Sequence, residues 1–380
     1  MTVTAVAVLV GCQSQQYPDD LLGWGFKFAS TLETDKKDQA KYQEKVLRQM
    51  ADLDEMDRAI NTLPQLEGWR KVAVAADITK VLAAEGDDVG ARALIASAEE
   101  WAKPVTGWQK ERIRAHLAEA YAFLGDTDKQ SEVSGSIDDK EEKLKNRLAD
   151  SFAMVASGDF EQAIEDLGAF HGQANFTLNL NLVSNYLTLF KLKQFQQNPE
   201  KKRILLNQAT KVARAMKFWV RCKVMADLAV LYIQDGDTDT AISLLQESEA
   251  VLQEVIREPR VAIPVLVDIA VAYHKADQME ESHRLMAQAT ELLNTDTMVE
   301  WDRSLAYPMV AYGAYICLSP AEGEQLFDTC LQRAEEQVNS RGKVIIVVDT
   351  CIFMNRCQFP FTRQVQSRLK QIYHSLGDPW

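Results

Sequence analysis

Apolar residues recur along most of this chain at the three- and four-residue spacing of amphipathic α-helices. In the segment 239–256 they fall on one helical face, opposite Glu and Gln: Ala241, Leu244, Leu245, Val251, Leu252 and Val255. A later segment has the same spacing with Leu326, Cys330, Leu331 and Ala334. Gly and Pro, 17 and 10 of 380 residues, are too scarce for the turns of a strand-rich fold. The pattern therefore predicts an all-α protein.

A five-residue pattern returns along the chain, in which an aliphatic residue is followed by a small one and, three positions after that, by an aromatic or aliphatic one. Its copies begin at Ile78, Leu117, Leu148, Leu182, Leu228, Ile269, Val310 and Val348. Successive copies start 31 to 46 residues apart, which is within the range of helix-pair repeats. Because one helical hairpin occupies each period, we expect an α-solenoid of antiparallel helix pairs with about eight repeats.

Two further sequence features recur at fixed positions relative to this pattern. Nine residues before it stands a tryptophan in four copies, followed two residues later by a cation: Trp69 and Lys71, Trp108 and Lys110, Trp219 and Arg221, Trp301 and Arg303. After the pattern comes a Gly-Asp turn in four copies, at Gly86, Gly125, Gly158 and Gly236. Glycine suits the left-handed residue that ends a helix, and the aspartate can cap the next helix.

The complete order Leu-Ala-x-x-Tyr-x-x-x-Gly-Asp-x-x-x-Ala, found in residues 228–241, resembles the tetratricopeptide repeat consensus. The resemblance covers about residues 65–380 and implies that the small residue and the last alanine lie where two helices approach closely. The copies from Gln278 and from Pro320 lack the glycine, the period is longer than in that family, and the family's late proline is missing. We therefore expect a tetratricopeptide-like array rather than a regular one.

The composition excludes some classes of protein. A net charge of −13 argues against a general nucleic-acid binder and against broad contact with anionic lipid, although residues 341–380 are basic. The six cysteines form no CxxC pair and predict neither a zinc site nor a disulfide framework. They are Cys12, Cys222, Cys317, Cys330, Cys351 and Cys357. Their expected role is that of small buried apolar side chains.

No recognisable catalytic or cofactor motif is present. The histidines form no HExxH set, and the sequence has neither a phosphate-binding glycine loop nor a GxSxG nucleophile elbow. Residues 235–239 begin like a calcium loop, but its sixth position is Thr240 and its twelfth is Gln246, instead of the glycine and glutamate that such a loop needs. We expect no enzyme, no metal and no cofactor.

The resemblance implies a ligand groove lined by the first helices of successive pairs. Carried over by position, five residues before the pattern, it places Arg112, Lys143, Lys223 and Lys343 in this groove. Other groove positions are Lys80, Glu119, Asp150, His274, Tyr312 and Tyr315. Four cations in one position suggest a positive stripe for an acidic peptide or a carboxylate terminus, while common exposed helix charges are the simpler explanation.

The amino terminus has two interpretations. The residues before Cys12 are apolar and small, and Leu9-Val10-Gly11-Cys12 resembles a bacterial lipoprotein signal box, which implies a diacylglycerol anchor on Cys12. The stretch is short for a signal sequence and no cation precedes it, so a buried first segment of the fold is the alternative. The first interpretation predicts a lipid-anchored protein of the bacterial cell envelope, and the second a cytoplasmic one.

These observations divide the chain into a leader and tether at 1–19, capping helices at 20–65, and repeats at 66–195 and 196–380. The capping helices are predicted from the helical spacing of Tyr42, Val46 and Met50. The function that we expect is a non-catalytic scaffold that binds a protein or peptide. The alternatives are a cytoplasmic regulator that senses a peptide, and an enzyme whose site lies between helices without a motif. The sequence does not decide the oligomeric state.

Overall fold

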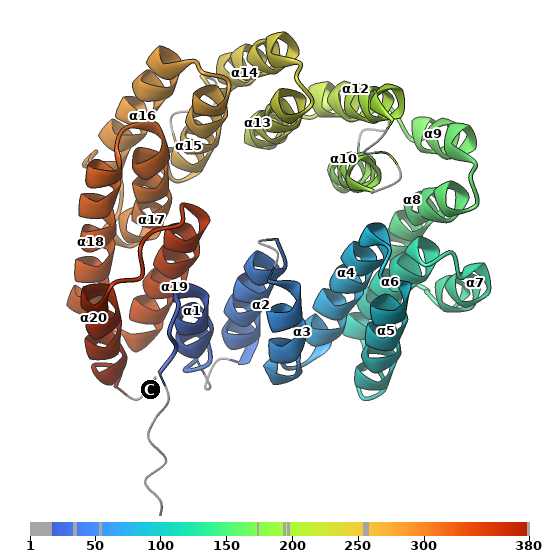
Figure 1. The fold of residues 1–380 in the computed structure, drawn as a ribbon, viewed down its shortest axis with the longest axis horizontal. Coiled ribbons are helices and arrows are strands. Elements are labelled where there is room, and N and C mark those ends of the chain that lie inside the picture. The colour runs from blue at the N-terminus through green and yellow to red at the C-terminus, as the bar shows by residue number, and fades with distance from the viewer. Residues whose placement is uncertain are drawn as a thin grey trace, which may run out of the picture.

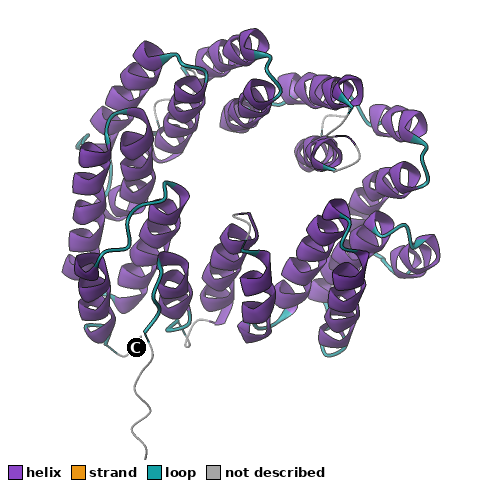
Figure 2. Cartoon of the chain, viewed as in Figure 1, coloured by secondary structure: helices purple, strands orange, loops and turns teal. Residues whose placement is uncertain are grey.

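The computed structural model describes residues 17–32, 36–52, 55–172, 175–192, 195, 198–253 and 258–377. Every regular element within these ranges is a helix, which confirms the all-α prediction. Successive helices alternate between an inner and an outer layer, and the layers curve into a ring (Figures 1 and 2). The chain is thus a solenoid of helix pairs whose two ends meet.

The inner helices are α2 (Lys36–Asp52), α4 (Trp69–Glu85), α6 (Trp108–Phe123), α8 (Lys140–Ala156), α10 (Phe176–Lys191), α13 (Phe218–Gln234), α15 (Pro259–Lys275), α17 (Glu300–Cys317) and α19 (Ser340–Arg356). The outer helices are α3 (Met56–Thr62) with the 3₁₀ turn η1 (Leu63–Gln65), α5 (Asp88–Ala102), α7 (Thr127–Gly135), α9 (Phe160–Gly168), α12 (Pro199–Ala215), α14 (Thr238–Leu252), α16 (Met279–Leu293), α18 (Pro320–Glu336) and α20 (Arg363–His374). Inner helices pack on one another in chain order, except that α12 bridges α10 and α13.

The corner between the helices of a pair forms as the sequence predicts, except that the Asp159 side chain makes no capping hydrogen bond to α9. Gly86 and Gly236 adopt the left-handed φ of 87° that favours glycine. The side chains of Asp87 and Asp237 then accept a hydrogen bond from a backbone N–H of the next helix. Between α15 and α16, where the sequence has no glycine, Asp277 takes the positive φ.

The small residues of the pattern lie where the two helices of a pair come closest. Ala118, Ala229 and Ala270 are fully buried, as are Ala163 and Ala241 of the outer helices. The aromatic positions fill the space between the helices, with Tyr121, Phe152, Tyr186, Tyr232 and Tyr273 all buried. This arrangement gives the array one continuous apolar core.

The ring closes between α19 and α2. Across this seam Lys45 donates to Asp349 at 2.6 Å, and Arg341 pairs with Asp38. The helix α1 (Leu21–Ala29) packs against both α19 and α2, and its Trp24 and Phe28 are fully buried. The segment 20–65, for which the sequence predicts capping helices, thus lies against the last inner helix of the array.

All inner helices run in one direction, since an outer helix returns the chain between them. We call the edge at which they begin the starting edge and the edge at which they end the finishing edge. Trp69 and Trp108 open α4 and α6, and Trp219 and Trp301 are the second residues of α13 and α17. The four tryptophans thus share one place on the starting edge, which confirms the spacing of the repeat.

The described cysteines, Cys222, Cys317, Cys330, Cys351 and Cys357, are buried free thiols, as expected. Burial raises the pKa of Cys317 and of Cys357 to about 11. Cys12 lies outside the described residues. In the part of the chain that the structure describes, no helix is both long and apolar enough to cross a bilayer.

Candidate functional site

Charged and amide side chains gather on the inner face where α4, α6 and α8 lie opposite α10. They enclose a cavity of about 250 Å³, which we call the charged pocket. Its lining includes Asp77, Lys80, Arg112, His116, Glu119 and Glu142 from the first three helices, and Asn181, Ser184, Asn185 and Thr188 from α10. Segments about 100 residues apart in sequence thus form one surface.

Ion pairs join each inner helix to the next in this region. Arg48 of α2 donates to Asp77 of α4 at 2.7 Å. The ammonium of Lys80 lies 2.8 Å from Asp77 and 2.9 Å from Glu119 of α6. The three side chains of this α4–α6 contact are each less than a quarter exposed, so solvent screens them less than a surface pair. They hold neighbouring repeats together as well as lining the pocket.

Asp77 is the centre of this network. Burial alone would raise the pKa of its carboxyl, but Lys80, His116 and Arg48 together hold that pKa well below its usual range. The pKa of Lys80 is raised, because the attraction of Asp77 and Glu119 exceeds the effect of burial. Both groups therefore stay charged at neutral pH.

Asp77, His116 and Glu119 also offer ligand atoms within 4.8 Å of one another, the arrangement that could hold a metal ion. The Nδ1 of His116 lies 3.6 Å from Asp77 and has no hydrogen-bond partner among the described residues. The ammonium of Lys80 already contacts both carboxylates, so a metal ion would have to displace it. This cluster is best described as a set of ion pairs.

The network continues toward the starting edge. Arg112 of α6 lies 3.7 Å from Glu142 of α8, which also binds Lys145. The guanidinium of Arg112 stacks over the rings of both Trp69 and Trp108. The aromatic residues of the repeat thus orient a cation of the charged pocket.

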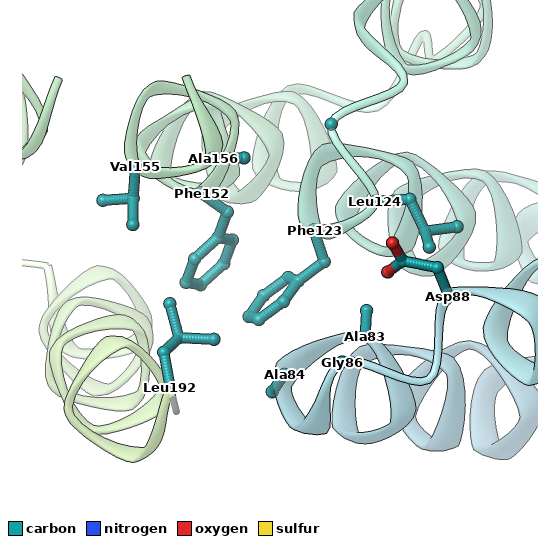
Figure 3. Close-up of a pocket in the computed structure, with 11 residues that line it drawn as sticks. Ala83, Ala84, Gly86, Asp88, Phe123, Leu124, Phe152, Val155, Ala156 and Leu192 are labelled. Atoms are coloured by element: carbon teal, nitrogen blue, oxygen red, sulfur yellow. The ribbon is translucent and has the colours of Figure 1, made fainter. Parts of the chain in front are cut away.

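An apolar pocket of about 640 Å³ adjoins the charged pocket at the finishing edge. Figure 3 shows Phe123 and Phe152 side by side in it, with ring centroids 4.1 Å apart, and Leu192 opposite them. Its other apolar walls include Ala83, Ala84, Leu124, Val155 and Ala156. Phe152 lines both pockets.

On the other side of α10 lies an aromatic pocket of about 380 Å³, lined by α10, α13, α15, α17 and α19. The rings of Tyr312 and Phe353 are 5.6 Å apart there. Burial raises the pKa of Asp227, and the nearby Asp268 adds to this effect while Lys223 opposes it. Lys223 is 3.0 Å from Asp268 and 3.6 Å from Asp227.

The structure brings some of the predicted groove residues together. Lys80, Arg112 and Glu119 line the charged pocket. Tyr312 lines the aromatic pocket, where Lys223 pairs with two of the lining aspartates. The cations Lys80, Arg112 and Lys223 do not form a free positive stripe, because each is paired with a carboxylate.

Other predicted groove residues lie elsewhere. Lys343 is buried and donates to Ser375 beyond the end of α20. Tyr315 packs toward Phe327 of α18 and Phe359, and Asp150 accepts a hydrogen bond from Gln130 of α7. These three side chains face the outer layer rather than the groove.

The last two predicted groove residues, Lys143 and His274, form no ion pair and no side-chain hydrogen bond with the described residues. Lys143 is exposed. His274 is partly buried, and its Nδ1 has no hydrogen-bond partner within the described ranges. Neither of them lines a pocket described above.

The sequence analysis missed the position just before the repeated pattern. In five copies it carries a polar residue that lines one of the pockets: Asp77, His116, Asn181, Asp227 and Asp268. A polar residue kept between apolar neighbours in the middle of a helix was the available signal. Phe152 was not recognisable as a pocket residue, since the aromatic position of the pattern normally fills the core, and Phe123 lies two residues after the pattern and carried no signal of its own.

No family model matches this chain, and no curated protein matches it. A solved structure to which it is similar is described as a "Circular tandem repeat protein with novel repeat topology and enhanced subunit contact surfaces". The two share 14% identity over 93% of this chain and 84% of that one, with a TM-score of 0.23. At this TM-score the similarity carries no argument, and the ring rests on the helices and contacts described above.

Proposed function

We propose that this chain is a non-catalytic scaffold of tetratricopeptide-like helix pairs that binds a segment of another protein on its inner face, between α4, α6, α8 and α10. The observation that carries this proposal is the pair of amides on α10. Asn181 and Asn185 line the charged pocket, and neither side chain has a hydrogen-bond partner in the described part of the chain. A side-chain amide has two donors and an acceptor, which match the N–H and C=O groups of a peptide backbone.

The charges of the pocket support binding over catalysis. A general acid or base works best when its pKa lies near the working pH. Cations lower the pKa of Asp77 instead, and its carboxylate is a weaker base as a result. Paired charges that are already oriented by their neighbours can still guide an incoming polar segment at little entropic cost.

A site-specific crosslink tests this proposal. A photoreactive benzoylphenylalanine would replace Thr188, which lines the charged pocket, or Thr329 on the outer face of α18. The two positions are matched, because each threonine donates to the backbone carbonyl four residues earlier. In an extract of the source cells we expect a defined protein adduct at position 188 and none at 329. Equal adducts at both positions, or none at 188, would contradict the proposal.

The place of this scaffold in the cell depends on Cys12. A signal box ending at that cysteine would anchor the ring on the bacterial envelope through a lipid, and its absence would leave a cytoplasmic adaptor. Mass spectrometry of the mature amino terminus separates the two proposals. A chain that begins with diacylated Cys12 supports the first, and a chain that retains residues 2–11 supports the second.

A further inference from the structure

The apolar pocket is large enough to admit a large side chain of a partner. Three inner helices end around it, and each contributes a small or aromatic residue to its walls: Ala84 of α4, Phe123 of α6 and Phe152 of α8 (Figure 3). Its volume of about 640 Å³ falls within the usual range of ligand pockets. Ala156 and Gly86 are exposed at its mouth, so the cavity opens to solvent.

The mouth of this pocket is acidic. Asp88 lines it, and Asp87, Asp126 and Asp159 directly follow the corners at which α4, α6 and α8 end. Arg92 lies 3.6 Å from Asp126. Asp87, Asp88 and Asp159 have no cation within ion-pair distance in the ranges that the structure describes.

We propose that the apolar pocket binds one large apolar side chain, such as Leu, Met or Phe, of a protein segment whose flanking residues are Lys or Arg. The proposal rests on the proposed function and names the chemistry of the bound segment. The apolar side chain would contact Phe123 and Phe152, and the flanking cations would meet the unpaired Asp87, Asp88 and Asp159. The segment would then continue past Phe152 into the charged pocket.

This occupant fits better than an acidic peptide or an anionic amphiphile. Either of these would bring its negative groups against the same three carboxylates, where like charges repel. From the sequence alone, a positive stripe suggested that the bound peptide is acidic. In the structure, however, Lys80 pairs with Glu119 and Arg112 with Glu142, so these cations are not free to bind an acidic peptide. The unpaired charge beside a hydrophobic cavity is negative.

Three fluorescein-labelled decapeptides serve as probes for fluorescence anisotropy with the full chain. The first has a central Leu flanked on each side by two Lys, the second replaces every Lys with Glu, and the third replaces the Leu with Gly. We expect the first to bind at least about tenfold more tightly than either of the others. Equal binding of the Lys and Glu peptides would overturn the proposal, as would equal binding of the Leu and Gly peptides.

A matched pair of variants locates the site. Ala156→Leu would fill the mouth of the pocket, since the Ala156 side chain lies 3.7 Å from where a Cβ on Gly125 would sit. Ala96→Leu adds the same group to the exposed face of α5. We expect at least about a tenfold loss of affinity for the Leu peptide in Ala156→Leu and no change in Ala96→Leu, with melting temperatures of both close to the parent. Unchanged affinity in Ala156→Leu contradicts the proposal.

The outcome is independent of the crosslinking test. An adduct at position 188 together with no preference for the Lys-flanked Leu peptide would reject the apolar anchor and leave the scaffold standing. Absence of both would reject the two proposals together. A peptide affinity that falls as salt rises from 50 to 300 mM would further support the contribution of the unpaired aspartates.

Discussion

The two arcs of this ring use one repeat in different ways. In the arc from α2 to α9, which we call the ion-paired arc, the outer helices α7 and α9 have only nine residues each. In the arc from α13 to α19, which we call the close-packed arc, the outer helices α14, α16 and α18 have 15 to 17 residues. The short helices α7 and α9 bury less apolar surface than their counterparts in the close-packed arc, whereas α5 of the ion-paired arc, with 15 residues, is as long as α14 and α16.

The contacts between repeats reflect this difference. Arg48–Asp77 and Lys80–Glu119 join successive inner helices of the ion-paired arc. In the close-packed arc, Gly313 of α17 lets Met286 and Val267 approach, and Gly323 of α18 lies against the backbone of α17. The close-packed arc thus has close helix contacts at these two glycines, while it also has an ion pair between inner helices, Lys223–Asp268, and the aromatic pocket.

The largest expected effect would break the close packing. A Cβ at Gly323 would lie 2.5 Å from the Cα and 2.7 Å from the backbone nitrogen of Tyr315, and backbone cannot move aside easily. We expect Gly323→Ala to lower the free energy of unfolding by about 3 kcal/mol. Gly313→Ala should cost less, because its closest neighbours are the flexible Met286 and the side chain of Val267. Urea unfolding of both variants measures the difference, and equal costs would contradict the packing argument.

The next effect would break the ion-paired arc. Lys80→Met keeps most of the side-chain volume but leaves Asp77 and Glu119 without their shared cation. We expect a loss of about 2 kcal/mol in the free energy of unfolding. Lys143→Met is the control, since Lys143 is exposed on the inner helix α8, and it should change stability by less than about 0.5 kcal/mol. A similar small change in both would show that the pairs contribute nothing measurable.

A third test compares the pH dependence of an inner-face aspartate in each arc. Asp77 has a lowered pKa, so its charge stabilises the fold above the unfolded pKa of about 3.9, and this contribution is lost as pH falls through the folded pKa. Asp77→Asn should therefore cost about 1–2 kcal/mol at pH 7 and less below pH 4. Stability curves at pH 3 to 7 would contradict this if the cost stayed constant.

Asp227 should behave in the opposite way. Its raised pKa favours the neutral form in the folded state, so its charge lowers stability at pH 7 and has no effect below the unfolded pKa. The Asp227 side chain is 54% exposed, which limits the effect through solvent screening. We expect Asp227→Asn to stabilise the protein by less than about 0.5 kcal/mol at pH 7 and to be neutral at pH 3. The same curves measure this, and destabilisation at pH 7 would contradict the prediction.

A similarly small effect concerns a glycine of the ion-paired arc. Gly135 is the last residue of α7, and a Cβ built there meets nothing within 4 Å. Gly135→Ala should raise the free energy of unfolding by about 0.5 kcal/mol, because alanine restricts the unfolded chain more than glycine does. The sign is opposite to that expected for Gly323→Ala, and a loss at both positions would remove this contrast between the arcs.

Much of the fold was predictable because it follows from local patterns. The corner glycines, the capping aspartates and the buried small residues of the pattern lie where the sequence placed them. The candidate site was predictable only in part. Lys80, Arg112 and Glu119 meet in one pocket, but Lys343 and Tyr315 turn toward the outer layer. Carrying groove positions over from the repeat pattern gives the wrong side chains wherever a neighbouring helix covers a different face of the inner helix.

The sequence by itself determined that the chain forms tandem helix pairs, because helical period, turn glycine and capping aspartate act within a few residues of one another. Only the tertiary structure decided that the array closes. Closure sums the small rotation between each pair and the next, and it brings α1 and α2 against α19 through residues some 300 positions apart. The same closure buries Val344 to Val348 of α19 on all sides, so five consecutive β-branched residues form a helix despite a local preference for strand.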